Sequence, residues 1–138
     1  MKMKIMIADD DDDDIKILKE VLEDIFDNRQ ILFSIQTAKN GVELMNNLEK
    51  EIDLPQLLFL DINMPIQDGF VCLNKIKTTD RYKHITVIML STSTFHGDIR
   101  RAYEIGAALY VAKATDYSNF KNKIENCLEL FKEAGLLI

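Results

Sequence analysis

Apolar runs of strand length alternate along the chain with amphipathic segments of helix length. The runs that predict strands are residues 3–8, 31–37, 57–61, 86–91 and 109–113. The third and fourth runs are almost continuously apolar, which is typical of central strands that are covered on both faces. The second run has polar ends, so we expect it at an outer position. Strands that alternate with helices indicate βα units around a mainly parallel sheet.

Each predicted strand is followed by apolar residues at helical spacing, which predicts five helices. Their apolar positions, in chain order, are Ile15, Leu18, Leu22 and Ile25; Val42, Met45, Leu48 and Ile52; Phe70, Leu73 and Ile76; Ile99, Ala102, Tyr103 and Ile105; and Phe120, Ile124, Cys127, Leu128 and Phe131. We expect the fourth helix from about residue 95 to residue 105 and the last to end near Gly135. Because parallel strands need right-handed crossovers and apolar strands need cover on both faces, the pattern predicts an α/β fold with a doubly wound, five-stranded parallel sheet.

The composition agrees with one domain over residues 1–138, in which 135–138 form a short apolar C-terminal tail. Hydrophobic residues make up 47% of the chain and charged residues 29%, which disfavours disorder and disulfide scaffolds. The net charge is −6, and residues 9–14 are an unbroken run of aspartates. Since no basic cluster is longer than Arg100-Arg101, we expect no nucleic-acid partner. No apolar stretch is long enough to span a membrane, so we expect a cytoplasmic protein with no membrane partner.

The cysteines and histidines show no metal-binding spacing. Cys72 and Cys127 are isolated in apolar surroundings, so we expect them to be small buried hydrophobic residues in a reducing compartment. His84 and His96 are expected in solvated loops, because neither has a second ligand at a suitable distance along the chain.

Polar residues stand where the predicted strands end. Asp9 and Asp10 follow the first strand, Asp61 ends the third, Ser91 ends the fourth and Lys113 ends the fifth. In a doubly wound sheet, ligands bind at the carboxyl ends of the strands. Clustered carboxylates repel one another unless a cation neutralises them, and one or two carboxylates together with waters suit Mg²⁺. The sequence therefore predicts a divalent-ion site.

These residues resemble the receiver domain of two-component response regulators. The elements that carry the resemblance, in chain order, are Asp9-Asp10, the segment DINMPIQDG at 61–69, Ser91, and Gly106-Ala107 leading to Lys113. The resemblance covers about residues 3 to 134 and is closest to free-standing receivers, the chemotaxis-type and small phytochrome-associated regulators. It implies a flavodoxin-like fold with the strand order 2-1-3-4-5.

The resemblance also implies a phosphorylation site. Asp61 would accept a phosphoryl group from the phosphohistidine of a histidine kinase. Asp9 and Asp10 would hold Mg²⁺ together with Asp61 and the backbone carbonyl of Asn63. These roles agree with the physical requirements of phosphoryl transfer, which are chiefly positioning and the neutralisation of spread negative charge by a metal and a lysine.

Three further residues receive roles from the resemblance. Lys113 and Ser91 would each contact a phosphoryl oxygen, and Ser91 with Tyr110 would form the switch. We therefore expect a phosphorylation-activated signalling protein that catalyses only its own phosphorylation and assists its own dephosphorylation, and that is otherwise not an enzyme. Its partners would be a sensor histidine kinase or phosphotransfer protein, and then a downstream protein or a second copy in a weak homodimer. That second contact would use the fourth helix, fifth strand and fifth helix.

The chain departs from the family pattern after Lys113 and after Ser91, where it has Thr92 in place of a small residue. Family members usually follow the lysine of the fifth strand with a proline in a cis peptide bond, whereas this chain has Ala114, so the Lys113-Ala114 bond could be cis or trans. The aspartates at 11–14 extend beyond the family's acidic pair. We expect them to cap and open the first helix, because acids favour the positive end of a helix.

Two other functions are kept as alternatives. Asp61 and Asn63 resemble the DxD signature of haloacid-dehalogenase-type phosphatases, although Asn63 replaces its second acid and the chain is short for a substrate-gating cap. A receiver fold that serves only as a scaffold is the other alternative, and the altered residue Ala114 is in its favour.

Overall fold

The predicted strands form one parallel sheet in the computed structural model, which describes residues 2–113 and 116–135. The strands are β1 (Lys2–Ala8), β2 (Leu32–Ala38), β3 (Leu57–Asp61), β4 (Thr86–Ser91) and β5 (Leu109–Ala112). Their order in the sheet is β2-β1-β3-β4-β5, and every neighbouring pair is parallel. The expected fold class, strand order and outer position of the second strand are confirmed. The tail at 136–138 and the bond to Ala114 lie outside the described residues.

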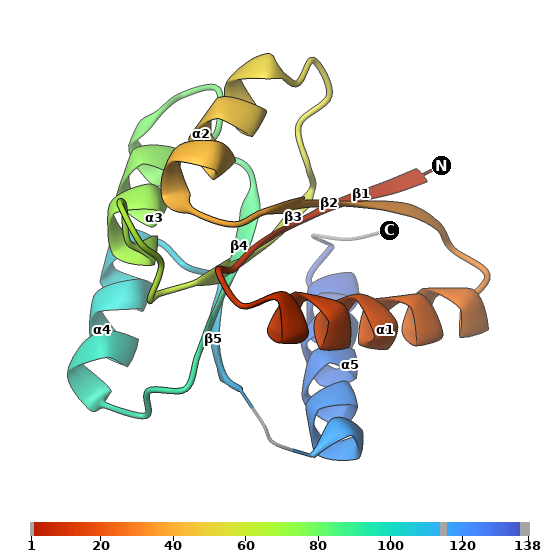
Figure 1. Ribbon diagram of the computed structural model, residues 1–138. Helices are drawn as coiled ribbons and strands as arrows, with labels where there is room; N and C mark the ends of the chain where they lie inside the picture. Colours follow the sequence, from red (N-terminus) through yellow and green to blue (C-terminus); the bar gives the residue numbers. More distant parts are fainter. Residues whose placement is uncertain (1, 114–115, 136–138) are drawn as a thin grey trace.

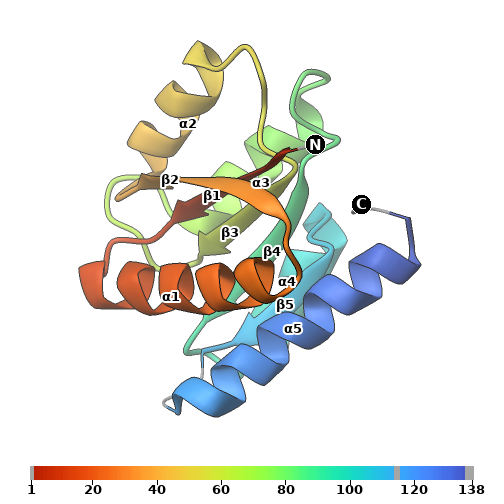
Figure 2. The same cartoon turned by 90° about the vertical axis from the view of Figure 1, so that its right-hand side faces the viewer.

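Helices cover both faces of this sheet (Figures 1 and 2). They are α1 (Asp12–Asn28), α2 (Gly41–Lys50), α3 (Gly69–Thr78), α4 (His96–Ile105) and α5 (Tyr117–Glu133). The helices α1 and α5 pack on one face, where their apolar side chains meet Ile5, Ile7 and Phe59. The helices α2, α3 and α4 pack on the other face, against Met6, Leu58 and Leu60. Successive residues of β1 and β3 thus point into opposite cores, which explains why these strands are apolar along their length.

The second helix differs from the prediction. It ends at Lys50, its buried positions include Leu44 and Leu48, and Ile52 beyond its end is 98% exposed. Val42 is 43% exposed, because the buried face runs from Gly41 through Leu44 to Leu48 and leaves Val42 at its margin. The spacing identified the helix, but it could not show which of several apolar residues face the sheet.

The ends of the last two strands and helices lie close to their predicted positions. His96 begins α4 and does not lie in a loop as expected, while β5 ends one residue before Lys113. Gly135 has a φ of 77° just after α5, which is the left-handed conformation of a helix end and confirms its predicted position. Cys72 and Cys127 are buried free thiols, as expected. Within 2–113 and 116–135, no helix has the length and apolar character that crossing a membrane requires.

The aspartate run opens α1 in the predicted way. The side chain of Asp11 is the N-cap and accepts hydrogen bonds from the amides of Asp13 at 2.9 Å and Asp14 at 3.2 Å. Asp12, Asp13 and Asp14 form the first turn. Their negative charge lies at the positive end of the helix, which stabilises it.

A close approach of backbones fixes the end of β3. A Cβ atom added at Gly69, the first residue of α3, would overlap the carbonyl oxygen of Asp61 and come within 2.8 Å of the Cα atom of Ile62. The amide of Gly69 donates to the carbonyl of Ile62 at 2.8 Å. Only glycine lets the helix begin this close to the strand, so Gly69 sets the backbone from which the Asp61 side chain projects.

We therefore expect Gly69→Ala to lower the free energy of unfolding by about 1–3 kcal/mol, because an added methyl group must push a backbone aside. Asn74→Ala is the matched control, since Asn74 is exposed on the same helix, and we expect it to change stability by less than about 0.5 kcal/mol. Urea unfolding of both variants measures the difference. Equal stability of the two variants would show that the loop yields without cost.

Candidate functional site

The carboxyl ends of β1, β3, β4 and β5 bring the predicted polar residues together. Among the described residues, the buried polar side chains are Asp9, Asp61 and Ser91, and all three lie at this edge of the sheet. Asp10 is exposed beside Asp9. One carboxylate oxygen from each of Asp9, Asp10 and Asp61 lies within 4.8 Å of the others. The parallel register produces this cluster, because it aligns the ends of strands that are far apart in the sequence.

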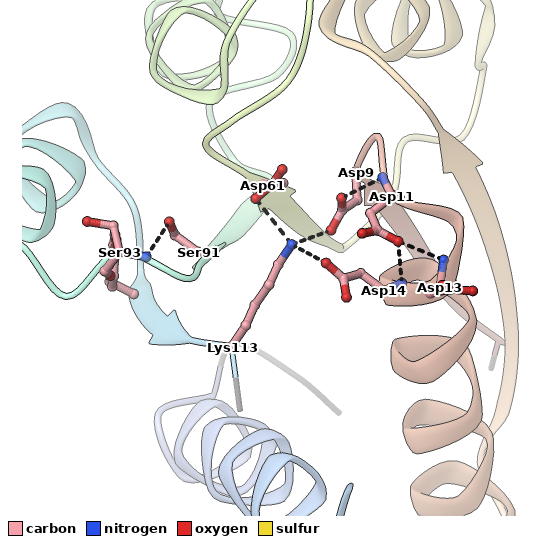
Figure 3. A network of polar contacts seen from close by, with 9 residues as sticks. Asp9, Asp11, Asp13, Asp14, Asp61, Ser91, Ser93 and Lys113 are labelled. Atoms are coloured by element: carbon pink, nitrogen blue, oxygen red, sulfur yellow. Dashed lines mark hydrogen bonds and ion pairs between the residues drawn. The ribbon is translucent and has the colours of Figure 1, made fainter. Parts of the chain in front are cut away.

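Lys113 supplies positive charge to this cluster (Figure 3). Its Nζ atom donates hydrogen bonds to Asp9 Oδ2 and Asp14 Oδ2, each at 2.8 Å, and lies 3.3 Å from Asp61 Oδ1. The side chains of Lys113, Asp9 and Asp61 are 14%, 5% and 6% exposed, so these charges are largely removed from water. One ammonium group therefore faces three carboxylates.

The pKa values of Asp61, Asp9 and Lys113 show that the one ammonium group only partly balances the charge of the carboxylates. Burial and the neighbouring Asp9 carboxylate raise the pKa of Asp61 to about 6, although Lys113 acts in the opposite direction. Burial also raises the pKa of Asp9, despite its hydrogen bonds from Lys113 and the Asp11 amide. For Lys113, burial opposes the charged form, but hydrogen bonds to Asp14 and Asp9 hold its pKa above the usual range. The lysine is thus firmly charged, while the carboxylates remain short of positive charge.

This donor set fits a hard divalent cation. Convergent carboxylate oxygens without nitrogen or sulfur ligands suit Mg²⁺, which binds through one or two carboxylates and keeps several waters. The exposed carboxylate of Asp10 lies on the solvent side of the cluster, where waters can complete the coordination. The raised pKa values of Asp9 and Asp61 also favour a cation site, since a cation would relieve the repulsion that causes part of each shift.

A second set of hydrogen bonds leads from Ser91 to α4. The Ser91 hydroxyl accepts from the amide of Ser93 at 3.0 Å, and the Ser93 hydroxyl bonds to Asp98 Oδ2 at 2.9 Å. The phenol of Tyr110 donates to the carbonyl of Ser93 at 2.8 Å. The amide of Tyr110 in turn donates to the hydroxyl of Tyr103 on α4 at 3.0 Å. The β4–α4 loop is thus tied to β4, β5 and α4 at once.

Known proteins resemble this chain in sequence and in fold. The family model for the response regulator receiver domain matches residues 5–125. The chain belongs to the response regulator receiver family. As such, it is a receiver domain of a two-component system.

Two curated relatives are longer than this chain. A probable methanogenesis regulatory protein, FilR2 from Methanothrix harundinacea, is 36% identical over 76 residues, which are 55% of this chain and 49% of that protein. A protein-glutamate methylesterase/protein-glutamine glutaminase from Methanococcoides burtonii is 33% identical over 117 residues, which are 83% of this chain and 31% of that protein. The receiver domain thus spans half or less of the curated relatives it matches.

Solved structures match over nearly the whole chain. The phosphorylated cyanobacterial phytochrome response regulator RcpA is 29% identical, with a TM-score of 0.84 and coverage of 95% of this chain and 94% of that one. The Mn²⁺-bound form of the response regulator Rcp1 is 25% identical, with a TM-score of 0.80 and coverage of 90% of each chain. These matches show the receiver fold over at least 90% of the chain.

Sequence reasoning missed the role of Asp14. It assigned the residue to the opening of α1, and it lies in that first turn, but its side chain also bonds to Lys113. The helical spacing held a signal, because Asp14 lies one turn before the buried Leu18 and therefore on the sheet side of the helix. Of the predicted residues, Asp9, Asp10, Asp61 and Lys113 meet directly, whereas Ser91 and Tyr110 meet through Ser93.

The raised pKa of Asp61 predicts a pH-dependent effect of removing its charge. Ionised Asp61 destabilises the fold above its folded-state pKa of about 6, and this penalty fades as the pH falls towards the ordinary value of 3.8. In metal-free buffer, we expect Asp61→Asn to be more stable than the parent by about 1–3 kcal/mol near pH 7, and we expect this gain to vanish near pH 4. Urea unfolding across this pH range measures it.

The control is Asp68→Asn, which removes the same charge at the exposed N-cap of α3, where asparagine caps equally well. A gain of similar size in this control would attribute the effect to net charge. A loss of stability in Asp61→Asn near pH 7 would contradict the assigned cause.

Proposed function

We propose that this receiver domain accepts a phosphoryl group on Asp61 from the phosphohistidine of a sensor histidine kinase or phosphotransfer protein, with Mg²⁺ bound. The observation that carries the proposal is the meeting of a buried carboxylate with two further carboxylates and a charged lysine at the strand ends. Similarity over 95% of the chain to the phosphorylated regulator RcpA supports the proposal. Although Ala114 departs from the family pattern, the cluster of Asp9, Asp10, Asp61 and Lys113 is complete, which argues against a scaffold role.

The metal ligands would be Asp9, Asp10, Asp61 and the backbone carbonyl of Asn63. Bound Mg²⁺ would neutralise the negative charge that builds up on the transferring group and its neighbours. The oxygen-only donor set and the raised pKa values of Asp9 and Asp61 support this assignment. The similar regulator Rcp1 has been solved with Mn²⁺, which is also a hard cation that favours oxygen ligands.

The transfer itself needs little from the protein beyond positioning and charge. A carboxylate oxygen of Asp61 would attack phosphorus and form an O–P bond, while the P–N bond of the phosphohistidine breaks. The electron pair of that bond stays on the imidazole nitrogen, so the donor leaves as a histidine. Lys113 would contact one phosphoryl oxygen and Ser91 another, and both would balance charge that spreads over the transferred group. Beyond this step and assistance to the hydrolysis of the aspartyl phosphate, in which water attacks phosphorus and inorganic phosphate leaves, we propose no enzymatic activity.

The signal would leave through Ser91, Tyr110 and α4. If the Ser91 hydroxyl turns to a phosphoryl oxygen, it gives up the Ser93 amide, and the β4–α4 loop loses one of its anchors. Tyr110 holds the same loop through the Ser93 carbonyl, so a change of the loop or of the Tyr110 rotamer would disturb the other through this hydrogen bond. Such a two-state element is what couples a local event to a distant surface.

The surface that would respond is formed by α4, β5 and α5, and it would bind a downstream protein or a second copy in a weak homodimer. Phe95 before α4 is 69% exposed and Tyr103 on α4 is 44% exposed, so apolar contact area is available there. The outer face of α5 is mixed in charge, which suits a reversible interface.

The phosphoacceptor is tested by treatment with a small phosphodonor and Mg²⁺, followed by intact-mass measurement. We expect the parent and the control Asp68→Asn to gain the mass of one phosphoryl group, and Asp61→Asn to gain none, because an amide lacks the nucleophilic oxygen. Asp10→Ala should gain it only slowly, since the metal site loses a ligand. Labelling of Asp61→Asn at one site would show that another residue is the acceptor.

The switch is tested with Tyr110→Phe, which removes the hydrogen bond to the Ser93 carbonyl and keeps the ring. We expect beryllofluoride, a phosphoryl analogue, to change the amide chemical shifts of α4 less in this variant than in the parent. Tyr82→Phe is the control, because Tyr82 lies in the α3–β4 connection away from the loop. Identical shift changes in α4 for the parent and Tyr110→Phe would remove Tyr110 from the pathway.

A further inference from the structure

Asp14 is a charged contact of Lys113 that the proposed function leaves unused. Its Oδ2 atom accepts from Lys113 Nζ at 2.8 Å, the same distance as that to Asp9. The third carboxylate, Asp61, is farther from Nζ, at 3.3 Å. Both short hydrogen bonds of the ammonium group are therefore made to residues other than the phosphoacceptor (Figure 3).

A phosphoryl group on Asp61 would bring new acceptor oxygens to a lysine that already has three carboxylate neighbours. An ammonium group has three protons to donate, and Asp9 and Asp14 already take two, so Lys113 can give the phosphoryl group a second proton only if one of these partners gives way. The side chain of Asp9 is 5% exposed, and without Lys113 it would keep only the Asp11 amide as a protein donor in a largely dry site, which is costly. The side chain of Asp14 is 36% exposed and can return to water.

The space around Asp14 permits this exchange. A cavity of about 30 Å³ is lined by residues that include Asp9, Asp14 and Lys113. That volume accommodates a water molecule, and the polar side chains around it can supply the hydrogen bonds that a buried water needs. Water can therefore replace Lys113 at Asp14 when the ammonium group moves towards Asp61.

We propose that Asp14 is a positioning residue that competes with the phosphoryl group for Lys113 and so favours the unphosphorylated state. The inference rests on the proposed function, because it requires that Asp61 be the phosphoacceptor. In the unphosphorylated protein, Asp14 holds Lys113 at the α1 side of the site. On phosphorylation, Lys113 exchanges the Asp14 carboxylate for a phosphoryl oxygen and keeps Asp9.

The proposal predicts different effects on the binding of beryllofluoride and of Mg²⁺ when Asp14 loses its charge. In Asp14→Asn, Lys113 faces a neutral amide oxygen instead of a carboxylate and is released at a lower cost, so beryllofluoride should bind more tightly at saturating Mg²⁺. Partly exposed ion pairs contribute modestly to stability, which sets the expected gain at about two- to fivefold. The affinity for Mg²⁺ alone should be unchanged or weaker, because a nearby negative charge is gone and Lys113 turns more to Asp9. A variant that merely loosened the fold would weaken both affinities.

The test is a titration of the full chain with each ligand, followed by the amide resonances of the parent, Asp14→Asn and Asp13→Asn. Asp13 is the matched control, since it stands in the same helical turn, is exposed and takes no part in the Lys113 contacts. We expect tighter beryllofluoride binding in Asp14→Asn only. In the Lys113→Ala background, Asp14→Asn should change the affinity for beryllofluoride no more than Asp13→Asn does, because the competition needs the lysine.

Three results would overturn the proposal. Equal gains in Asp14→Asn and Asp13→Asn would attribute the effect to net charge. Weaker beryllofluoride binding in Asp14→Asn would mean that Asp14 presents Lys113 to the phosphoryl group, and an effect that persists without Lys113 would place the cause elsewhere. If the parent itself binds no beryllofluoride at Asp61, the proposed function fails together with this inference, whereas normal binding by the parent with no change in Asp14→Asn overturns this inference alone.

Discussion

The sharing of one ammonium group among carboxylates at the end of a parallel sheet is the interaction on which this site depends. Lys113 contacts Asp9, Asp14 and Asp61, and Asp10 adds a further carboxylate to the same cluster. One positive charge cannot neutralise this group, which is why burial and mutual repulsion raise the pKa of Asp61 to about 6. The excess negative charge suits a divalent cation. Because Lys113 is shared among several carboxylates, the position of its ammonium group is sensitive to any new charge at the site.

The fold produces this imbalance by bringing together strand ends that the sequence keeps far apart. The strand register pairs Asp61 with Leu90 and Ser91 with Ala112. The carboxyl ends of neighbouring strands therefore lie at the same edge of the sheet. Gly69 lets α3 begin against the backbone of Asp61, which fixes the backbone position from which the carboxylate projects. Two apolar cores, one on each face, hold the strands in place. Stability thus resides in the cores, and the destabilising charge is confined to the edge.

Much of this could be predicted from the sequence, since period and strand-end chemistry are local signals. The strands, their parallel arrangement and the meeting of Asp9, Asp10, Asp61 and Lys113 follow from apolar runs that end in charged residues. The predicted apolar face of α2 was wrong at Val42 and Ile52, because periodicity does not tell which apolar residues contact the sheet. The Asp14 contact depends on how α1 is rotated against β5, and packing determines that rotation. The hydrogen bonds of Ser93 depend on loop geometry and leave no pattern in the sequence.

The most direct test of the central claim is a crystal structure of the protein with Mg²⁺ and beryllofluoride. The account predicts the ion on Asp9, Asp10 and Asp61, beryllofluoride on the Asp61 carboxylate, and Lys113 Nζ about 3 Å from a fluorine atom and no longer bonded to Asp14. A structure in which the ion binds elsewhere, or in which Lys113 keeps Asp14 while beryllofluoride occupies Asp61, would contradict the idea that this shared lysine answers the charge at the phosphoacceptor.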